Sequence, residues 1–240
     1  DNKTERECAA AAIAAAEDAG YDSLADCIAA GTPVGPGSKL WACAQGKAVI
    51  LVHVGAAPIS EGMNILGAHI DSPRLDIKQN PLYEANDFAL LDTHYYGGIK
   101  NYQWTALPLA LHGVVALKDG SVLNVKICED AADPVFYISD LLPHLAAKQN
   151  KKPLGEAIEG EDLNLLIGSI PVKGEEKEAV KKNILAILKE KYDIEEDDFI
   201  SAELEVVPAG AARDYGFDRS MIGAYSHDDR VCANPALTAL

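Results

Sequence analysis

Residues 67–76 read GAHIDSPRLD and carry the strongest chemical signal in this sequence. They follow a short apolar run, Asn64-Ile65-Leu66, which is typical of a buried strand. His69 and Asp71 lie where that strand is expected to end, and side chains i and i+2 of a strand point the same way. The carboxylate of Asp71 is then placed to hold one imidazole nitrogen of His69, which leaves the other for a metal ion. The alternative is a core histidine that a neighbouring aspartate satisfies, because a metal site needs further ligands.

The composition of the 240 residues argues against several classes of protein. Hydrophobic residues make up 48% of the chain, which is ordinary for a globular protein with a core. The formal net charge of −16 argues against nucleic acids and anionic membrane surfaces as partners, because both select basic patches. The charged start of the chain, DNKTERE, is not that of a signal peptide, and no apolar run reaches the ~18 residues of a membrane helix. Five cysteines without a CxxC pair favour free thiols and a cytoplasmic location.

The chain before residue 80 mixes helical and extended patterns. Residues 4–20 begin with a capping box and continue as an alanine-rich helix, and residues 23–31 predict a second, shorter helix. Residues 40–54, with a turn around Gly46, predict a β-hairpin.

From about Pro81 the pattern changes and strands dominate. Extended runs are predicted at residues 88–93, 104–117, 121–127, 163–170 and 200–207. Lys118-Asp119-Gly120 predicts a hairpin turn, and the apolar spacing of residues 175–191 predicts a helix. Asn234-Pro235 predicts the start of another helix. Because the sequence stops inside the first turn of that helix, we expect it to continue in the complete protein.

A second polar cluster, SHDDR at residues 226–230, lies far from His69 in the sequence. Asp228 and Asp229 are adjacent carboxylates, and a carboxylate can bridge two divalent ions, as a two-metal site requires. The alternative is a capped turn, in which the carboxylates cap a helix and pair with Arg230. The residues alone leave both interpretations open.

Several motifs in this order resemble the M18 family of metallo-aminopeptidases, the aspartyl aminopeptidase family, in its bacterial branch. The motifs are GAHIDSPRLD at 67–76, KQNPLYE at 78–84, THYYGGIK at 93–100, DPVF at 133–136, DLLPH at 140–144 and DDRVC at 228–232. The resemblance runs over essentially the whole chain and covers about the first half of a family member.

This resemblance implies an α/β fold, with a zinc-peptidase-like catalytic domain, incomplete here, and an inserted, mostly β dimerisation domain. The catalytic domain would occupy residues 1–80 and resume at 213–240, and the insertion would occupy 81–212. The change of pattern near Pro81 agrees with that division. The resemblance also implies a homo-oligomer built from dimers, acting on peptide substrates.

The resemblance further implies roles for three residues. His69 would be the terminal ligand of one zinc ion, Asp71 would orient His69, and Asp228 would bridge two zinc ions, with Co²⁺ or Mn²⁺ as alternative metals. Asp229 stands where a polar neighbour is usual and is not assigned to metal. The general base, a glutamate, and two further ligands would lie beyond Leu240. The activity implied is hydrolysis of N-terminal residues, acidic ones among them, and the 240-residue chain alone is predicted to be inactive and to bind zinc weakly.

Other polar residues have two interpretations each. His94 could face an active site, of its own or a neighbouring subunit, or could be a satisfied loop histidine. Arg74 and Arg230 could recognise an acidic substrate side chain, although such arginines more often pair with local aspartates, here Asp76 and Asp229. His227 is a weak candidate for a residue that supports the metal ligands. The remaining histidines, 53, 112 and 144, are expected to be structural.

The rival class of function is non-catalytic. The chain could be an oligomerisation or scaffold module whose metal half is vestigial, or an inactive fragment. A mononuclear metallohydrolase of another family is less favoured, because the segments around Lys100 and Asp228 would then match by coincidence. Replacement of Asp228 by alanine in the complete protein separates these classes, since an enzyme loses activity and a scaffold keeps its assembly.

Overall fold

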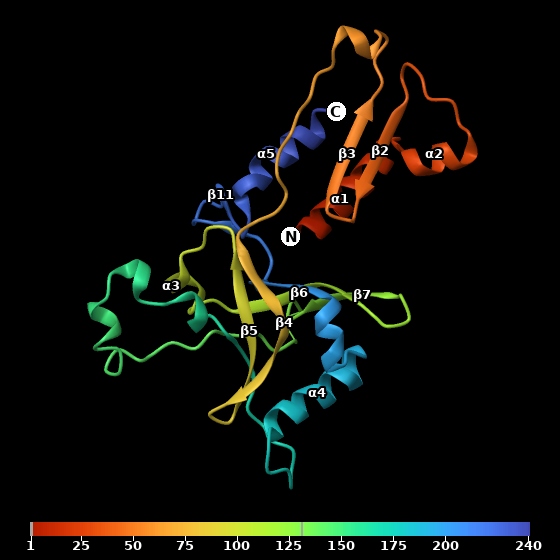
Figure 1. Ribbon diagram of the computed structural model, residues 1–240. Coiled ribbons are helices and arrows are strands. Elements are labelled where there is room, and N and C mark those ends of the chain that lie inside the picture. The colour runs from red at the N-terminus through yellow and green to blue at the C-terminus, as the bar shows by residue number, and fades with distance from the viewer. Residues whose placement is uncertain (1, 131) are drawn as a thin grey trace. The chain divides into compact units, whose positions relative to one another are not determined.

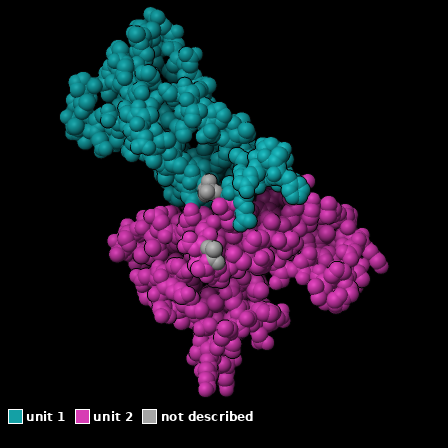
Figure 2. All heavy atoms as spheres, turned by 180° about the vertical axis from the view of Figure 1, so that it is seen from behind, with its two compact units in different colours: residues 1–72, 212–240 teal, residues 73–211 magenta. Residues whose placement is uncertain are grey.

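The computed structural model describes residues 2–130 and 132–240 and divides into two compact units (Figure 1, Figure 2). Unit 1 comprises residues 1–72 and 212–240, and unit 2 comprises residues 73–211. Unit 2 is thus inserted into the chain of unit 1, and it begins before Pro81 because strand β4 already starts at Arg74. None of the helices in the described part of the chain has the length and apolar character needed to cross a membrane.

Local side chains set the ends of the first helices in unit 1. The helices of this unit are α1 (Glu5–Asp18), α2 (Leu24–Ala30) and α5 (His227–Thr238). α1 starts at a capping box in which Thr4 and Glu7 satisfy each other's backbone N–H groups. α2 is capped by Ser23 and ends at Gly31, whose φ of 66° is a conformation that glycine adopts without steric cost. The helices predicted at 4–20 and 23–31 are confirmed.

The strands of unit 1 form two small sheets. They are β1 (Asp22–Ser23), β2 (Lys39–Ala44), β3 (Ala48–His53), β10 (Arg213–Tyr215) and β11 (Met221–Gly223). β2 pairs in parallel with β1 and antiparallel with β3, which confirms the predicted hairpin over residues 40–54. α1 lies against β2 and β3, and β10 pairs antiparallel with β11.

Two predictions for unit 1 are wrong. Residues 64–66 are not a buried strand, because Ile65 and Leu66 are 79% and 60% exposed and no described strand pairs with them. An apolar run becomes a strand only where a neighbour offers backbone partners. The last helix, α5, does not start at Asn234-Pro235 but runs through Pro235. Asp228 and Asp229 have non-helical backbone angles, so the regular part of α5 begins at about Arg230 and Pro235 lies beyond its first turn. A proline there lacks the N–H that would bond to the preceding turn, and its ring crowds the carbonyl four residues earlier.

Unit 2 is built on a six-stranded sheet in the order β7-β6-β9-β4-β5-β8. Its strands are β4 (Arg74–Ala85), β5 (Phe88–Tyr96), β6 (Leu109–Ala116), β7 (Val122–Ile127), β8 (Leu165–Gly168) and β9 (Ala202–Pro208). Every pairing between them is antiparallel. The predicted turn at residues 118–120 joins β6 to β7. The strand predicted from Trp104 begins only at Leu109, because Trp104 ends the short helix α3 (Asn101–Trp104).

The core of unit 2 lies on this sheet. Leu75, Leu109, Leu165 and Val206 are completely buried. β6 and β9 approach so closely at Gly113 that a Cβ there would lie 2.0 Å from the carbonyl oxygen of Glu203. Helix α4 (Ala179–Tyr192), predicted over 175–191, packs against β4, β5 and β8.

Candidate metal centre

His69 and Asp71 are hydrogen-bonded to each other in the loop that precedes unit 2. Nδ1 of His69 lies 3.1 Å from the backbone oxygen of Asp71 and 3.1 Å from its Oδ1. Both oxygens are acceptors, so Nδ1 carries a proton and donates to them. Nε2 is therefore the nitrogen that could bind a metal ion after losing any proton it carries. The spacing of these two residues led us to expect this contact.

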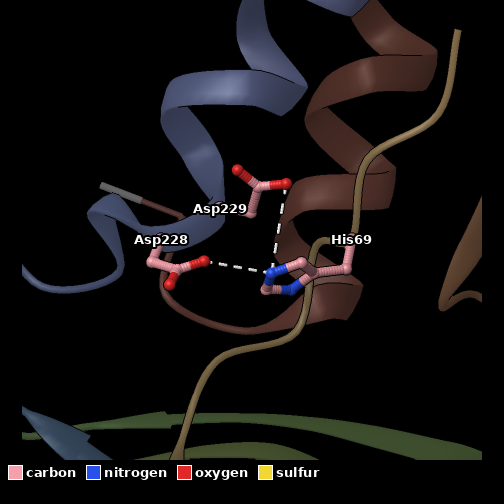
Figure 3. A group of neighbouring side chains, drawn as sticks. All are labelled: His69, Asp228 and Asp229. Atoms are coloured by element: carbon pink, nitrogen blue, oxygen red, sulfur yellow. Dashed lines mark hydrogen bonds and ion pairs between the residues drawn. The ribbon is translucent and has the colours of Figure 1, made fainter.

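The other nitrogen of His69 faces the second polar cluster (Figure 3). Nε2 lies 3.1 Å from Oδ1 of Asp228 and 4.0 Å from Oδ2 of Asp229, at the start of α5. His69 and Asp228 are 159 positions apart, and both belong to unit 1. Their side chains are 51% and 91% exposed, so the cluster is open to solvent.

The carboxylates change the acidity of His69. Desolvation lowers the pKa of His69, but hydrogen bonds to Asp228 and Asp71 outweigh it and raise the pKa above its usual value. Both ring nitrogens face acceptors, which favours the doubly protonated imidazolium when no metal ion is bound. A metal ion at Nε2 would have to displace that proton.

The donor set fits zinc. Imidazole nitrogen and carboxylate oxygen are both ordinary zinc ligands, at about 2.0–2.2 Å. Two such ligands of a tetrahedral ion stand roughly 3.3 Å apart, and Nε2 of His69 and Oδ1 of Asp228 are 3.1 Å apart. With Asp229, three ligand atoms lie within 4.8 Å of one another. These residues fit part of the shell of a zinc ion, since structural and catalytic sites use three or four protein ligands.

Comparisons with known proteins agree with this chemistry. The model of the family described as aminopeptidase I zinc metalloprotease (M18) matches residues 1–240. The chain belongs to the M18 family. Its predicted family and α/β fold are thereby confirmed.

Individual M18 relatives match along nearly the whole chain. A protein of Clostridium acetobutylicum named "Probable M18 family aminopeptidase 1" is 59% identical over 239 residues, which are 99% of this chain and 51% of that protein. The crystal structure of an M18 aminopeptidase from Thermotoga maritima is 46% identical, with a TM-score of 0.93, over 100% of this chain and 52% of that one. Aminopeptidase I from C. acetobutylicum is 55% identical, with a TM-score of 0.91, over 99% and 52%. The chain thus spans about half the length of these M18 relatives.

Arg74 of this M18 chain is held by local contacts rather than displayed for a ligand. It is 5% exposed, and its Nε lies 2.8 Å from Oδ1 of Asp76 and 3.1 Å from Oε2 of Glu205. Its guanidinium also stands over the ring of Tyr96, 4.2 Å from the centroid. The expectation of a local aspartate partner is confirmed.

The other candidates lie outside the His69 cluster. Arg230 donates to the backbone oxygen of Lys3 at 3.4 Å, and His227 donates through Nε2 to the backbone oxygen of Ile222 at 2.9 Å. His94 is an exposed residue of β5 whose ring stacks on Tyr95. His112 is buried beside Glu129, with 2.9 Å between Nε2 and Oε1, in agreement with a structural role.

Two residues near His69 and Asp228 received no metal-site role from the sequence. Asp229 was not assigned to the metal, yet its carboxylate points at Nε2 of His69 (Figure 3). Ser72 is 3% exposed, and its hydroxyl donates to the backbone oxygen of Asp228 at 3.3 Å. The adjacent carboxylates were a signal for Asp229, whereas nothing in the sequence connects Ser72 with a residue 156 positions away.

Proposed function

We propose that the protein is a zinc-dependent aminopeptidase that removes N-terminal residues from peptides. The observation that carries the proposal is the arrangement of His69, with Nε2 facing Asp228 at 3.1 Å and Nδ1 held by Asp71. Membership of the M18 family supports the metal and the class of reaction.

The residues of the chain have distinct parts in this proposal. Nε2 of His69 and the carboxylate of Asp228 would hold zinc, and Asp228 would serve both ions of a two-metal site, for which Co²⁺ or Mn²⁺ could substitute. Asp71 keeps the proton on Nδ1 and thereby keeps Nε2 available. Zinc held here supplies Lewis-acid chemistry toward a peptide carbonyl and toward water. The exposure of His69 and Asp228 leaves room for a peptide to reach them.

The proposal assigns the activity to the complete protein. The 240-residue chain is expected to be inactive and to bind zinc weakly, because His69, Asp228 and Asp229 cannot fill the shells of two ions. Unit 1 is then part of the catalytic domain. Unit 2 is the dimerisation domain of a cytoplasmic homo-oligomer, and its exposed Leu141, Leu142 and Leu145 offer apolar surface for such contacts.

The test is peptide hydrolysis by the complete protein. We expect release of the first residue from peptides with a free N-terminus and none from N-acetylated peptides. A chelator should abolish the activity and zinc should restore it. Asp228→Asn should lower kcat/KM at least about 100-fold. Loss of a residue that only supports a metal ligand costs up to about 100-fold in activity, and loss of a ligand itself should cost more. The matched control is Asp218→Asn, because Asp218 lies in the same unit and accepts hydrogen bonds from the backbone and hydroxyl of Ser220.

Three results would decide against parts of the proposal. Activity that survives both the chelator and Asp228→Asn contradicts the zinc mechanism. An assembled protein that cleaves no peptide supports the scaffold alternative. Acidic N-terminal residues should be among those removed, and failure to release Asp or Glu from peptides that begin with them would contradict this part.

A further inference from the structure

Ser72 joins the two ligand-bearing segments through an atom that is not a metal ligand. Its hydroxyl donates to the backbone oxygen of Asp228, while the carboxylate of Asp228 points to His69. Both segments belong to unit 1, although 156 positions separate the two residues. The contact ties the loop that carries His69 to the main chain that carries Asp228.

This contact differs from those that His69 itself makes. The contacts of His69 with Asp228 and Asp229 use Nε2 and carboxylate oxygens, which are the atoms that zinc would take. Zinc binding therefore replaces them. The hydrogen bond of Ser72 uses a backbone oxygen, so zinc binding does not require this bond to break.

Burial makes the hydroxyl of Ser72 dependent on this partner. The residue is 3% exposed, so water cannot readily take the place of the backbone oxygen of Asp228. Ser72 also directly follows Asp71, which fixes the ring of His69. One tight stretch of chain thus sets both the orientation of the imidazole and its distance from Asp228.

We propose that Ser72 is a positioning residue of the metal site, which holds Asp228 at the spacing from His69 that a zinc ion requires. The inference rests on the proposed function, because it presupposes that zinc binds to His69 and Asp228. Without the hydroxyl, zinc has to order the two segments as it binds, and its affinity falls.

The test is the zinc affinity of the complete protein, measured by competition with a chelating dye. Ser72→Ala should weaken zinc binding about tenfold. Loss of a residue that supports a metal ligand typically lowers metal affinity by about 10- to 100-fold, and we expect the smaller loss here. The matched control is Ser201→Ala, because the hydroxyl of Ser201 donates to the backbone oxygen of Ala116 in unit 2, at 2.7 Å. This control also removes a hydroxyl that donates to backbone oxygens, those of Ala116 and Asp198, but from an exposed serine of unit 2, and it should leave zinc affinity unchanged. Ser72→Thr keeps the hydroxyl and should bind zinc within about threefold of the wild type.

Thermal unfolding separates positioning from a general loss of stability. Ser72→Ala and Ser201→Ala should both lower the Tm without zinc, and only Ser72→Ala should shrink the rise in Tm that zinc produces. Zinc affinity of Ser72→Ala within twofold of the wild type overturns the inference, as does Ser72→Thr binding no better than Ser72→Ala. A wild-type protein that binds no zinc, or His69→Ala binding as tightly as the wild type, contradicts the proposed function instead.

Discussion

Unit 2 buries a core of large apolar side chains, whereas unit 1 buries few and exposes many. Leu75, Leu109 and Leu165 of unit 2 are completely buried. The buried apolar residues described in unit 1 are Ala9, Ala16, Tyr21, Cys27 and Leu40. Large apolar residues of unit 1 with more than half of their surface exposed include Ile28, Ile50, Ile59, Ile65, Leu66, Phe217 and Ile222.

This difference places His69, Asp228 and Asp229 in the less stabilised unit of the 240-residue chain. Burial of apolar surface contributes about 25 cal/mol per Å², so the core of unit 2 supplies most of the hydrophobic stabilisation. In unit 1, a zinc ion that binds only the folded form would add stability by mass action. The following predictions concern the 240-residue chain unless stated otherwise.

The largest expected effect is a core substitution in unit 2. Leu109→Ala should lower the free energy of unfolding by about 2–5 kcal/mol, because Leu109 is completely buried and alanine leaves a cavity. The same substitution at Leu66 of unit 1, which is 60% exposed, should cost less than about 0.5 kcal/mol. Urea unfolding followed by circular dichroism measures both. Equal costs would show that the two units do not differ in packing as described.

The alkylation of two buried cysteines can follow the unfolding of each unit separately. Cys27 lies in unit 1 and Cys128 in unit 2, where burial, with the charges of Asp133 and Glu129, raises the pKa of Cys128 to about 12. In pulsed alkylation at increasing urea, Cys27 should become reactive at a lower urea concentration than Cys128, because unit 1 opens first. Cys43 is exposed and should react without urea, which makes it the internal control. Simultaneous exposure of Cys27 and Cys128 would mean that the units unfold as one.

Sequence reasoning succeeded where neighbours along the chain decide the structure. The helix capped by Thr4 and the turn at Gly120 depend on hydrogen bonds and backbone conformations within a few residues. The contact of His69 with Asp71 is equally local. Such features are written into the order of the residues, so the sequence predicts them.

The sequence prediction failed where contacts between residues far apart in the chain determine the structure. The apolar run at residues 64–66 resembles a strand, but pairing depends on what lies beside it. The sequence prediction placed Asp228 in the same site as His69 because the chain resembles M18 proteins. The spacing of the two residues along the chain gave no reason to pair them. The contacts of Ser72 and Asp229 follow from how the two segments meet, which no local pattern encodes.

The smallest expected effect is a pH dependence of the metal centre. Because the pKa of His69 is raised, its contacts with Asp228 and Asp71 stabilise the folded protein fully below the ordinary pKa of about 6.5, and this stabilisation is lost as the pH rises through the raised value. Zinc affinity should change in the opposite direction, because zinc binds the neutral imidazole. It should fall about tenfold per pH unit below the raised pKa of His69 and level off above it. Titration of the complete protein with zinc between about pH 5.5 and 8.5 measures this, and an affinity that is flat down to pH 5.5 would contradict it.

The central claim is that His69 and Asp228 hold zinc, and anomalous X-ray diffraction at the zinc edge tests it most directly. Crystals of the complete protein with zinc should show an anomalous peak about 2.1 Å from Nε2 of His69 and from a carboxylate oxygen of Asp228. Nδ1 of His69 should still face Asp71. A zinc peak elsewhere in the molecule, with His69 and Asp228 in direct contact as they are here, would contradict the account.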